Sequence, residues 1–400
     1  MRNPREIVYD RFIKPFVGKK SCNVGVELEF PLINNNGGDV DTQYVASIMD
    51  SIEGKGFSCV LYGVNGEKLF MENSAGDCLS FDNSYNNFEF SMMHGDNLCD
   101  IKSRFDTYYT MVQEFLGKKN HTLCGRGTNP NFKNISVNHT PFSTYNMVQE
   151  YLHKFPGNHN YNDFPAFMSS VQTHLDIDEK RLPEVYTLFC RMDFVRALLF
   201  GNSPDFENRE WRIFRDYLWE NSGFGNCPEI TGSVDREFLS CDDIVDFFLE
   251  KGIFNRIRDN KYEVFKPVKI REYFADEIYG ASEEDIECYL SFRNVEITSR
   301  GTLEVRSDCA QKEGRFFMPP AFNLGILSNY EKAKKTLDNF FSENLINKKP
   351  SELRRLATEC KDEEIAPKNV LDELCRNMTD IAVEGLQKRG KGEEEILKMG

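Results

Sequence analysis

Two glutamates, Glu27 and Glu29, lie two positions apart in the otherwise apolar segment from Val26 to Phe30. On the period of a strand both carboxylates share one face, and the apolar side chains take the other. Carboxylates about 7 Å apart on a rigid strand suit a hard divalent cation such as Mg2+, which prefers oxygen ligands. The alternative that these residues leave open is an amphipathic edge strand with a solvated acidic face.

Three later segments repeat this division into an apolar face and a polar face. They place the following side chains on polar strand faces: Glu89, Gln172, His174, Glu304 and Arg306. A lone histidine is more often a structural residue than a ligand, but His174 has Gln172 and Asp176 beside it on the same face. So many acids on one face need cations, and together these positions predict a metal site.

A second polar constellation lies in residues 211–219. If this segment is helical, Arg215 and Trp219 are one turn apart and share a face, which could brace a guanidinium against an indole. The alternative is an ordinary surface arginine.

The elements that must position these residues follow from periodicity and turn residues. We expect strands at 78–82, 87–91 and 170–177, and hairpins at 59–71 and 295–306. Helices are expected at 98–116, 180–200, 240–251, 321–335, 336–346 and 369–389, with another capped by Ser351. We expect loop or polar connection at 129–163 and 265–274, and a frayed charged end at 388–398.

Composition limits the function classes. The chain has 400 residues, a formal charge of −15 and 33 phenylalanines, which predicts a well-buried core and argues against nucleic-acid or anionic-membrane partners. No long apolar run or signal peptide is visible, so we expect a cytoplasmic protein. The 12 cysteines are scattered without a Cys-x-x-Cys pair, as is typical of reduced buried thiols.

No Pro/Ser-rich linker or internal repeat divides the chain. We therefore predict a single catalytic domain over residues 1–400, with an N-terminal helix in 1–20, a sheet-containing core in 21–320 and C-terminal helices in 321–400. The sequence does not indicate the oligomeric state.

In their order along the chain, these motifs resemble the glutamate–cysteine ligase family, the bacterial and plant-type branch of the glutamine synthetase-like carboxylate–amine ligases. The matching segments are 25–30, 88–91, 171–176, 202–204, Arg215 with Trp219, 303–306 and 384–390. Each motif is weak alone, but their shared order from about residue 20 to 390 is hard to produce by chance.

The resemblance implies an α+β fold, in which a curved, mostly antiparallel sheet forms a funnel-shaped active site with helices packed outside. It also implies a reaction that joins the γ-carboxylate of glutamate to the amine of cysteine, with hydrolysis of ATP to ADP and phosphate. A carboxylate does not react with amines, so ATP first converts it to an acyl phosphate. Two or three Mg2+ ions, with Mn2+ as a substitute, screen the triphosphate.

The resemblance also assigns roles to residues. Glu27, Glu29, Glu89 and Glu304 match metal-binding acids, and His174 matches a metal or phosphate ligand. Asp82 stands where some bacterial members place another acid, although a turn aspartate is as good an explanation. Arg215 matches a glutamate-holding arginine, with Gln172 and Trp219 beside the substrate. Arg306 is placed to meet the transferring phosphate, although an ion pair with Glu304 or Glu27 would explain it equally well.

Some segments depart from the family pattern. Glu296 replaces a residue that tends to be basic, the turn 299–301 is inserted, and the Asn- and His-rich loop 129–163 has no counterpart. Because these departures are expected near the substrates, the amine acceptor is open. The alternatives are a ligase of the same fold that uses another amine or a peptide, for example in natural-product synthesis, and a non-catalytic nucleotide-binding homologue.

Overall fold

A computed structural model describes residues 2–19, 22–205, 211–227 and 229–398. The predicted boundary at residues 20–21 lies outside the described residues. The strands are β1 (Val24–Asn34), β2 (Phe57–Tyr62), β3 (Lys68–Asn73), β4 (Cys78–Phe81), β5 (Asn87–Gly95), β6 (His121–Leu123), β7 (Ser170–Asp176), β8 (Thr231–Gly232), β9 (Gly252–Arg258), β10 (Lys261–Lys269), β11 (Phe292–Arg293), β12 (Val295–Ile297) and β13 (Thr302–Cys309).

The helices alternate with these strands and then dominate the C-terminal part. They are α1 (Pro4–Val8), α2 (Thr42–Ala46), α3 (Ile48–Ile52), α4 (Leu98–Gly117), α5 (Ser143–Lys154), α6 (Leu182–Arg191), α7 (Asp193–Phe200), α8 (Phe214–Glu220), α9 (Cys241–Leu249), α10 (Ile270–Ala275), α11 (Met318–Ser328), α12 (Tyr330–Glu343), α13 (Pro350–Thr358), α14 (Lys368–Arg389) and α15 (Glu395–Lys398). The helix predicted near the N-terminus continues from α1 through π and 3-10 turns to Phe16.

The main sheet has the strand order β12-β13-β7-β1-β5-β4-β3-β2, with β6 added to β1. Every pairing described in it is antiparallel. The expected α+β fold on an antiparallel sheet is therefore confirmed. The central strand β1 is buried, and its apolar side chains, such as Val26, Leu28 and Phe30, are at most 1% exposed.

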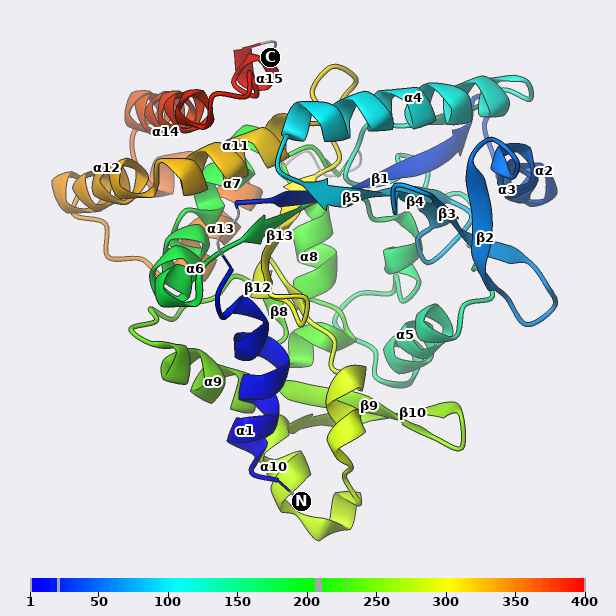
Figure 1. The fold of residues 1–400 in the computed structure, drawn as a ribbon, viewed down its shortest axis with the longest axis horizontal. Helices are drawn as coiled ribbons and strands as arrows, with labels where there is room; N and C mark the ends of the chain where they lie inside the picture. Colours follow the sequence, from blue (N-terminus) through cyan, green and yellow to red (C-terminus); the bar gives the residue numbers. More distant parts are fainter. Residues whose placement is uncertain (1, 20–21, 206–210, 228, 399–400) are drawn as a thin grey trace.

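Helices cover one face of this sheet. α4 packs on β5, α7 on β13 and α11 on β7, and α14 lies against α11 in a second layer (Figure 1). The apolar alternate residues of the strands face these helices, and phenylalanines such as Phe30, Phe90 and Phe105 interlock there. The polar alternate residues therefore face the other way, towards α5 and α8.

Several sequence expectations are wrong in detail. The segment 265–274, expected as a polar connection, forms the end of β10 and most of α10, and the loop 129–163 contains α5. Ser351 lies inside α13, whose N-cap is Lys349. The expected frayed end contains α15, which buries Ile396 and Leu397.

Two long helices were expected in places where the chain bends. The segment 180–200 divides at Met192, and the break between α11 and α12 is at Asn329 rather than near residue 335. Within the described residues, no helix combines the length and the apolar character that crossing a bilayer requires.

Candidate functional site

The order of the central strands brings the predicted site residues together. Glu29 lies directly opposite Glu89 on β5, Glu27 lies opposite Gln172 on β7, and His174 lies opposite Glu304 on β13. Directly opposed residues of antiparallel strands share a face. Residues that are as much as 277 positions apart thus form one polar surface, on the face of the sheet away from α4 and α11.

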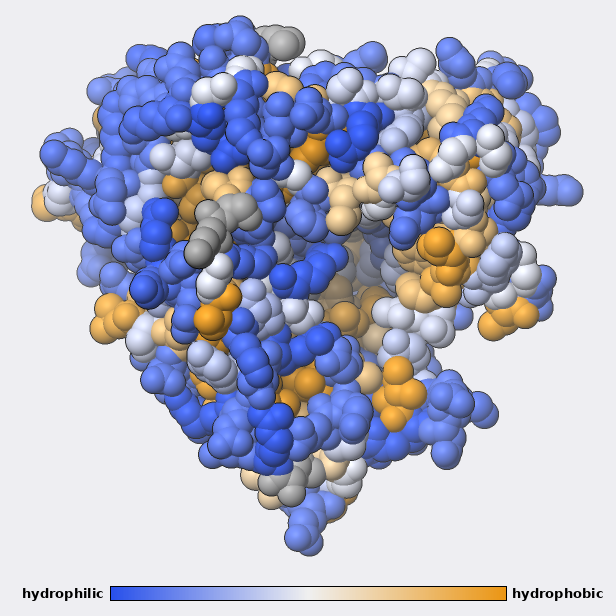
Figure 2. Space-filling model, in the orientation of Figure 1, coloured by the Kyte–Doolittle hydropathy of each residue, from blue (hydrophilic) through white to orange (hydrophobic). Residues whose placement is uncertain are grey.

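This surface is one wall of a cavity of about 420 Å³. Figure 2 shows the recess near the centre of the face viewed, where the surface is hollowed below the sheet. The predicted residues that line it are Glu27, Glu29, Asp82, Glu89, Gln172, Arg215, Trp219, Glu304 and Arg306. His174 adjoins the cavity through its contact with Glu27.

Glu27, His174 and Glu304 form a compact group of possible metal ligands. One ligand atom from each lies within 4.8 Å of the other two, and in the described residues this is the group that meets that condition. Nε2 of His174 is 3.1 Å from Oε1 of Glu27, and Nδ1 is 3.2 Å from the Thr302 hydroxyl, which orients the ring. Two carboxylates and an oriented imidazole fit a divalent cation such as Mg2+ or Mn2+.

Glu27 has cationic neighbours. Burial alone would raise the pKa of its carboxyl, but His174, Arg300 and Arg306 lower that pKa to about 2. Glu27 therefore carries a negative charge at neutral pH, as a ligand for a cation requires.

Glu29 is deeper in the cavity wall. Its Oε2 accepts hydrogen bonds from the backbone N–H (2.8 Å) and hydroxyl (3.1 Å) of Ser170, and its Oε1 accepts one from Gln172 at 2.5 Å. Burial, reinforced by the charge of Asp82, raises the pKa of Glu29 to about 8. The side-chain amide of Gln172 is therefore bonded to Glu29 and is not free to donate the same hydrogen to a ligand.

Glu89 and Asp82 complete the acidic surface. Burial and the charges of Glu27, Asp82 and Glu29 raise the pKa of Glu89 well above its usual value, and Ser91 donates a hydrogen bond to it at 2.5 Å. Burial raises the pKa of Asp82 to about 6, although hydrogen bonds from groups such as Asn83 oppose this rise. Asp82 and the neighbouring Asn83, which donates to it at 3.0 Å, both line the cavity from the bend that follows β4.

Arg215 is buried at the start of α8, with its guanidinium under the sheet. Its Nη atoms donate to the backbone carbonyls of Ser169 and Asp308 at 3.3 Å and of Arg306 at 3.4 Å. Its Nε is buried without a hydrogen-bond partner in the described residues. The expected brace by Trp219 is wrong, because this indole stacks on Phe292 with the ring centroids 4.6 Å apart.

Arg306 occupies the bulge that interrupts the pairing of β13 with β7. Its Nε is 3.9 Å from Oε1 of Glu304, and its Nη1 donates to the carbonyl of Ser291 at 2.5 Å. The ion pair with Glu304 that the sequence left open is therefore present. The bulge turns the arginine towards the cavity, where it adjoins the acidic surface.

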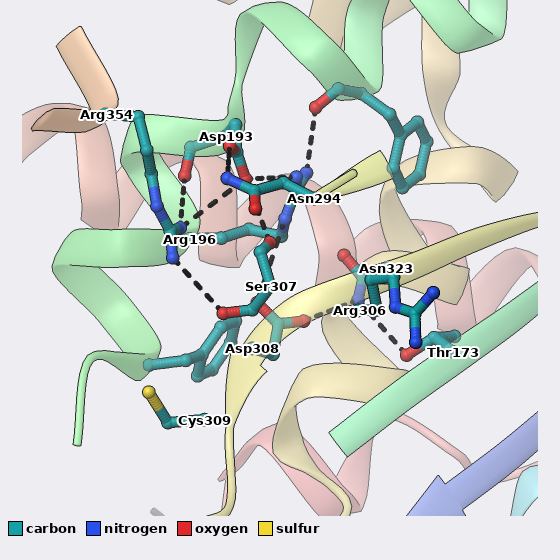
Figure 3. Close-up of polar contacts among 12 residues, drawn as sticks. Thr173, Asp193, Arg196, Asn294, Arg306, Ser307, Asp308, Cys309, Asn323 and Arg354 are labelled. Atoms are coloured by element: carbon teal, nitrogen blue, oxygen red, sulfur yellow. Dashed lines mark hydrogen bonds and ion pairs between the residues drawn. The ribbon is translucent and has the colours of Figure 1, made fainter. Parts of the chain in front are cut away.

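A buried polar network supports the bulge from behind (Figure 3). Asp193 accepts hydrogen bonds from Arg196 at 2.6 Å, from Ser307 at 2.9 Å and from Asn294 at 2.8 Å. Arg354 donates to the carbonyls of Asp193 and Ser307. Since Ser307 and Asn294 also line the cavity, this network ties the site to α7 and α13.

Sequence reasoning assigned no role to several polar residues of the cavity wall, such as Tyr145, Glu220 and Arg300. Tyr145 lines the cavity from α5, and Arg300 lies on the inserted turn. The apolar positions Met147, Val148 and Tyr151 are spaced as on a helix and could have indicated α5.

The departure at Glu296 has a different explanation from the one expected. Glu296 lies opposite Glu304 on β13, but it does not line the cavity and is buried in an ion pair with Lys251. The side chain of Lys251 in turn lies over the ring of Phe248, with Nζ 3.5 Å from its centroid.

Comparison with known proteins gives distant similarity. No protein-family model matches the chain, and no curated protein matches it. Among solved structures, a bifunctional glutathione synthetase from Pasteurella multocida is 14% identical with a TM-score of 0.43, and the match covers 99% of this chain and 54% of that one. This chain therefore spans about half the length of that protein.

Two further solved structures are similar at the same level. Glutamate–cysteine ligase from Francisella tularensis, in complex with AMP, is 8% identical with a TM-score of 0.35, over 96% of this chain and 98% of that one. The ligase PafA in complex with the prokaryotic ubiquitin-like protein Pup is 11% identical with a TM-score of 0.38, over 99% of this chain and 63% of that one.

Proposed function

We propose that this chain is an ATP-dependent ligase that joins a carboxylate to an amine, with glutamate as the donor and cysteine as the first acceptor to test. The observation that carries the proposal is the convergence of Glu27, His174 and Glu304 beside two further glutamates in one cavity. An acidic cavity repels both ATP and a carboxylate substrate unless cations fill it. A divalent cation held there would screen the triphosphate.

The reaction that fits this site has two steps. An oxygen of the donor carboxylate attacks the γ-phosphorus, and ADP leaves. The amine then attacks the acyl carbon of the acyl phosphate, phosphate leaves, and the amine gives up a proton. No side-chain nucleophile is needed. Two of the hydroxyl groups in the cavity wall, those of Ser91 and Ser170, are already bonded to Glu89 and Glu29.

The arginines would have separate tasks. Arg306 projects into the cavity beside Glu304 and would meet the charge on the transferring phosphate. Three of the five N–H donors of Arg215 go to backbone carbonyls, and Nε is buried, so the remaining N–H of Nη2 would hold a carboxylate of the donor substrate. Gln172 would act on the substrate only indirectly, because it is bonded to Glu29. Trp219 lines the same cavity and would bound the substrate space.

The test is phosphate release from ATP and Mg2+ with glutamate present, with each of the twenty amino acids and several simple amines added in turn, and with mass detection of products. A large rise with cysteine alone, and a γ-glutamylcysteine mass, supports the full proposal. Product with another amine or a peptide keeps the ligase and replaces the acceptor. No phosphate with any acceptor means either that the carboxylate donor is not glutamate or that the chain binds nucleotide without catalysis.

A further inference from the structure

Arg300 lies at the tip of the β12–β13 turn, at the edge of the cavity. Its side chain is 65% exposed, yet Nη2 is 3.5 Å from Oε1 of Glu27 and 3.4 Å from Nε2 of His174. These are atoms of the compact group of possible metal ligands. A guanidinium therefore stands beside the place that a divalent cation would take.

The backbone that carries Arg300 is fixed. Gly301 has φ +74°, and a Cβ at this position would lie 2.4 Å from the carbonyl oxygen of Pro15, so the turn packs tightly against the N-terminal segment. Within the turn, Gly301 N–H donates to Thr298 at 3.0 Å, and Thr298 N–H donates to Thr302 at 2.9 Å. Any movement of the guanidinium must therefore come from side-chain rotation.

Backbone carbonyls hold the guanidinium groups of the other two arginines of the cavity wall. Arg215 is held by three backbone carbonyls, and Arg306 is held by the carbonyl of Ser291. Arg300 has only long polar contacts with Glu27 and His174, and most of its side chain faces solvent. Such a contact is worth little and is easily exchanged.

We propose that Arg300 is an exchangeable cation. It neutralises Glu27 before a divalent cation binds, and turns to a phosphate oxygen of ATP afterwards. The proposal rests on the proposed function for its second half, the phosphate contact. The physical reason is repulsion: a guanidinium and a divalent cation cannot both lie against the same two ligand atoms without strong mutual repulsion. A released guanidinium pairs well with phosphate oxygens.

The experiment measures Mn2+ binding by electron paramagnetic resonance, without nucleotide, and then ATP binding in the presence of saturating Mn2+. Arg300→Ala is expected to bind Mn2+ at least threefold more tightly than the wild type, because the competing charge is gone. It should bind ATP at least tenfold more weakly. Arg300→Lys keeps the charge and should lie closer to the wild type in both measurements.

Arg271→Ala is the matched control, since Arg271 is a half-exposed arginine on α10 that pairs with Glu250, and it should match the wild type in both measurements. Unchanged or weaker Mn2+ binding by Arg300→Ala overturns the exchange. Tighter Mn2+ binding with unchanged ATP affinity overturns the phosphate contact.

Failure of the proposed function has a different signature. A wild type that binds no Mn2+ overturns the metal site and the exchange with it. Mn2+ and ATP affinities that change as expected, in a protein that releases no phosphate from glutamate and any acceptor, support the role of Arg300 and contradict only the proposed ligase reaction.

Discussion

Glu29 and Glu89 face each other directly across the antiparallel pair β1 and β5, with both side chains in the cavity wall. Directly opposed residues have Cβ atoms about 5 Å apart, and like charges there destabilise a sheet. Burial raises the pKa of both carboxyls, and the negative charges of neighbouring acids raise it further. The pair is therefore unfavourable when both carboxyls are ionised. Either a proton on one of the two carboxyls or a bound cation would relieve this repulsion.

Replacing Glu89 by Gln should separate stability from function. The amide can still accept the Ser91 hydrogen bond, and the repulsion from Glu29 is removed. We expect Glu89→Gln to raise the free energy of unfolding without metal by about 1 kcal/mol at pH 8.5, and to lower phosphate release at least about tenfold. Urea unfolding and the phosphate assay measure the two effects.

Glu72→Gln is the control for this change, because Glu72 is an exposed glutamate of the same sheet, on β3. It should change neither quantity. A destabilised Glu89→Gln protein would mean that the carboxylate is held by favourable contacts, and would contradict the repulsion.

Removing a ligand of the compact group should abolish metal-dependent stabilisation. A ligand that binds only the folded state stabilises it by RT ln(1 + [L]/Kd), and so raises the melting temperature. We expect Mn2+ to raise the melting temperature of the wild type, and to have little effect on Glu304→Gln. In EDTA the two proteins should melt within a few degrees of each other, since Glu304 is lost only from a 3.9 Å ion pair with Arg306. An equal Mn2+ response in both would place the cation elsewhere.

The sequence predicted the faces of the strands but not their register. Alternation of Glu27 and Glu29 with apolar residues identified which side chains leave the core, and the buried Val26, Leu28 and Phe30 agree. The opposition of Glu29 to Glu89, or of His174 to Glu304, depends on a strand order that is not the sequence order. Such pairings are set by long-range packing, which no local pattern contains.

Local sequence features explain why β10 and α5 were not predicted. β10 contains Pro267 and many charged residues, which are typical of connections, and its pairing with β9 is irregular between Val264 and Val268. The helix α5 lies in a segment rich in Asn, His and Pro, where those residues masked a short amphipathic pattern. Tyr145 could not be predicted as a site residue because the loop 129–163, although expected near the substrates, was not expected to contain the helix that positions it.

Close packing of two helices should make one glycine irreplaceable. A Cβ at Gly325 of α11 would lie 2.3 Å from the carbonyl oxygen of Ala382 on α14, and one at Gly385 would lie 2.0 Å from the carbonyl oxygen of Gly325. Since backbone cannot move aside, Gly325→Ala should lower the free energy of unfolding by about 2 kcal/mol or more. Gly117→Ala, at the end of α4 with open space around it, should be neutral or slightly stabilising in the same urea experiment.

Asp308 should give the stability of the protein a specific dependence on pH. One of its oxygens accepts a hydrogen bond from Asn323 at 3.0 Å, whereas the other has no hydrogen-bond partner in the described residues and lies 3.7 Å from Arg196. Burial raises the pKa of Asp308 to about 6, although Arg196 opposes this. Between pH 4 and 6 the folded protein therefore binds a proton that the unfolded chain has already released.

The contribution of Asp308 to stability is consequently complete below about pH 4 and is lost as the pH rises through 6, a decline of up to about 3 kcal/mol. Asp308→Asn cannot titrate and should lack this decline. Urea unfolding from pH 4 to 7.5 should show the wild type losing about 2–3 kcal/mol relative to the variant. Asp106→Asn, at an exposed aspartate that pairs with Lys102, should keep the wild-type profile. Parallel profiles for wild type and Asp308→Asn would show that the carboxylate is ionised throughout, with Arg196 as a sufficient partner.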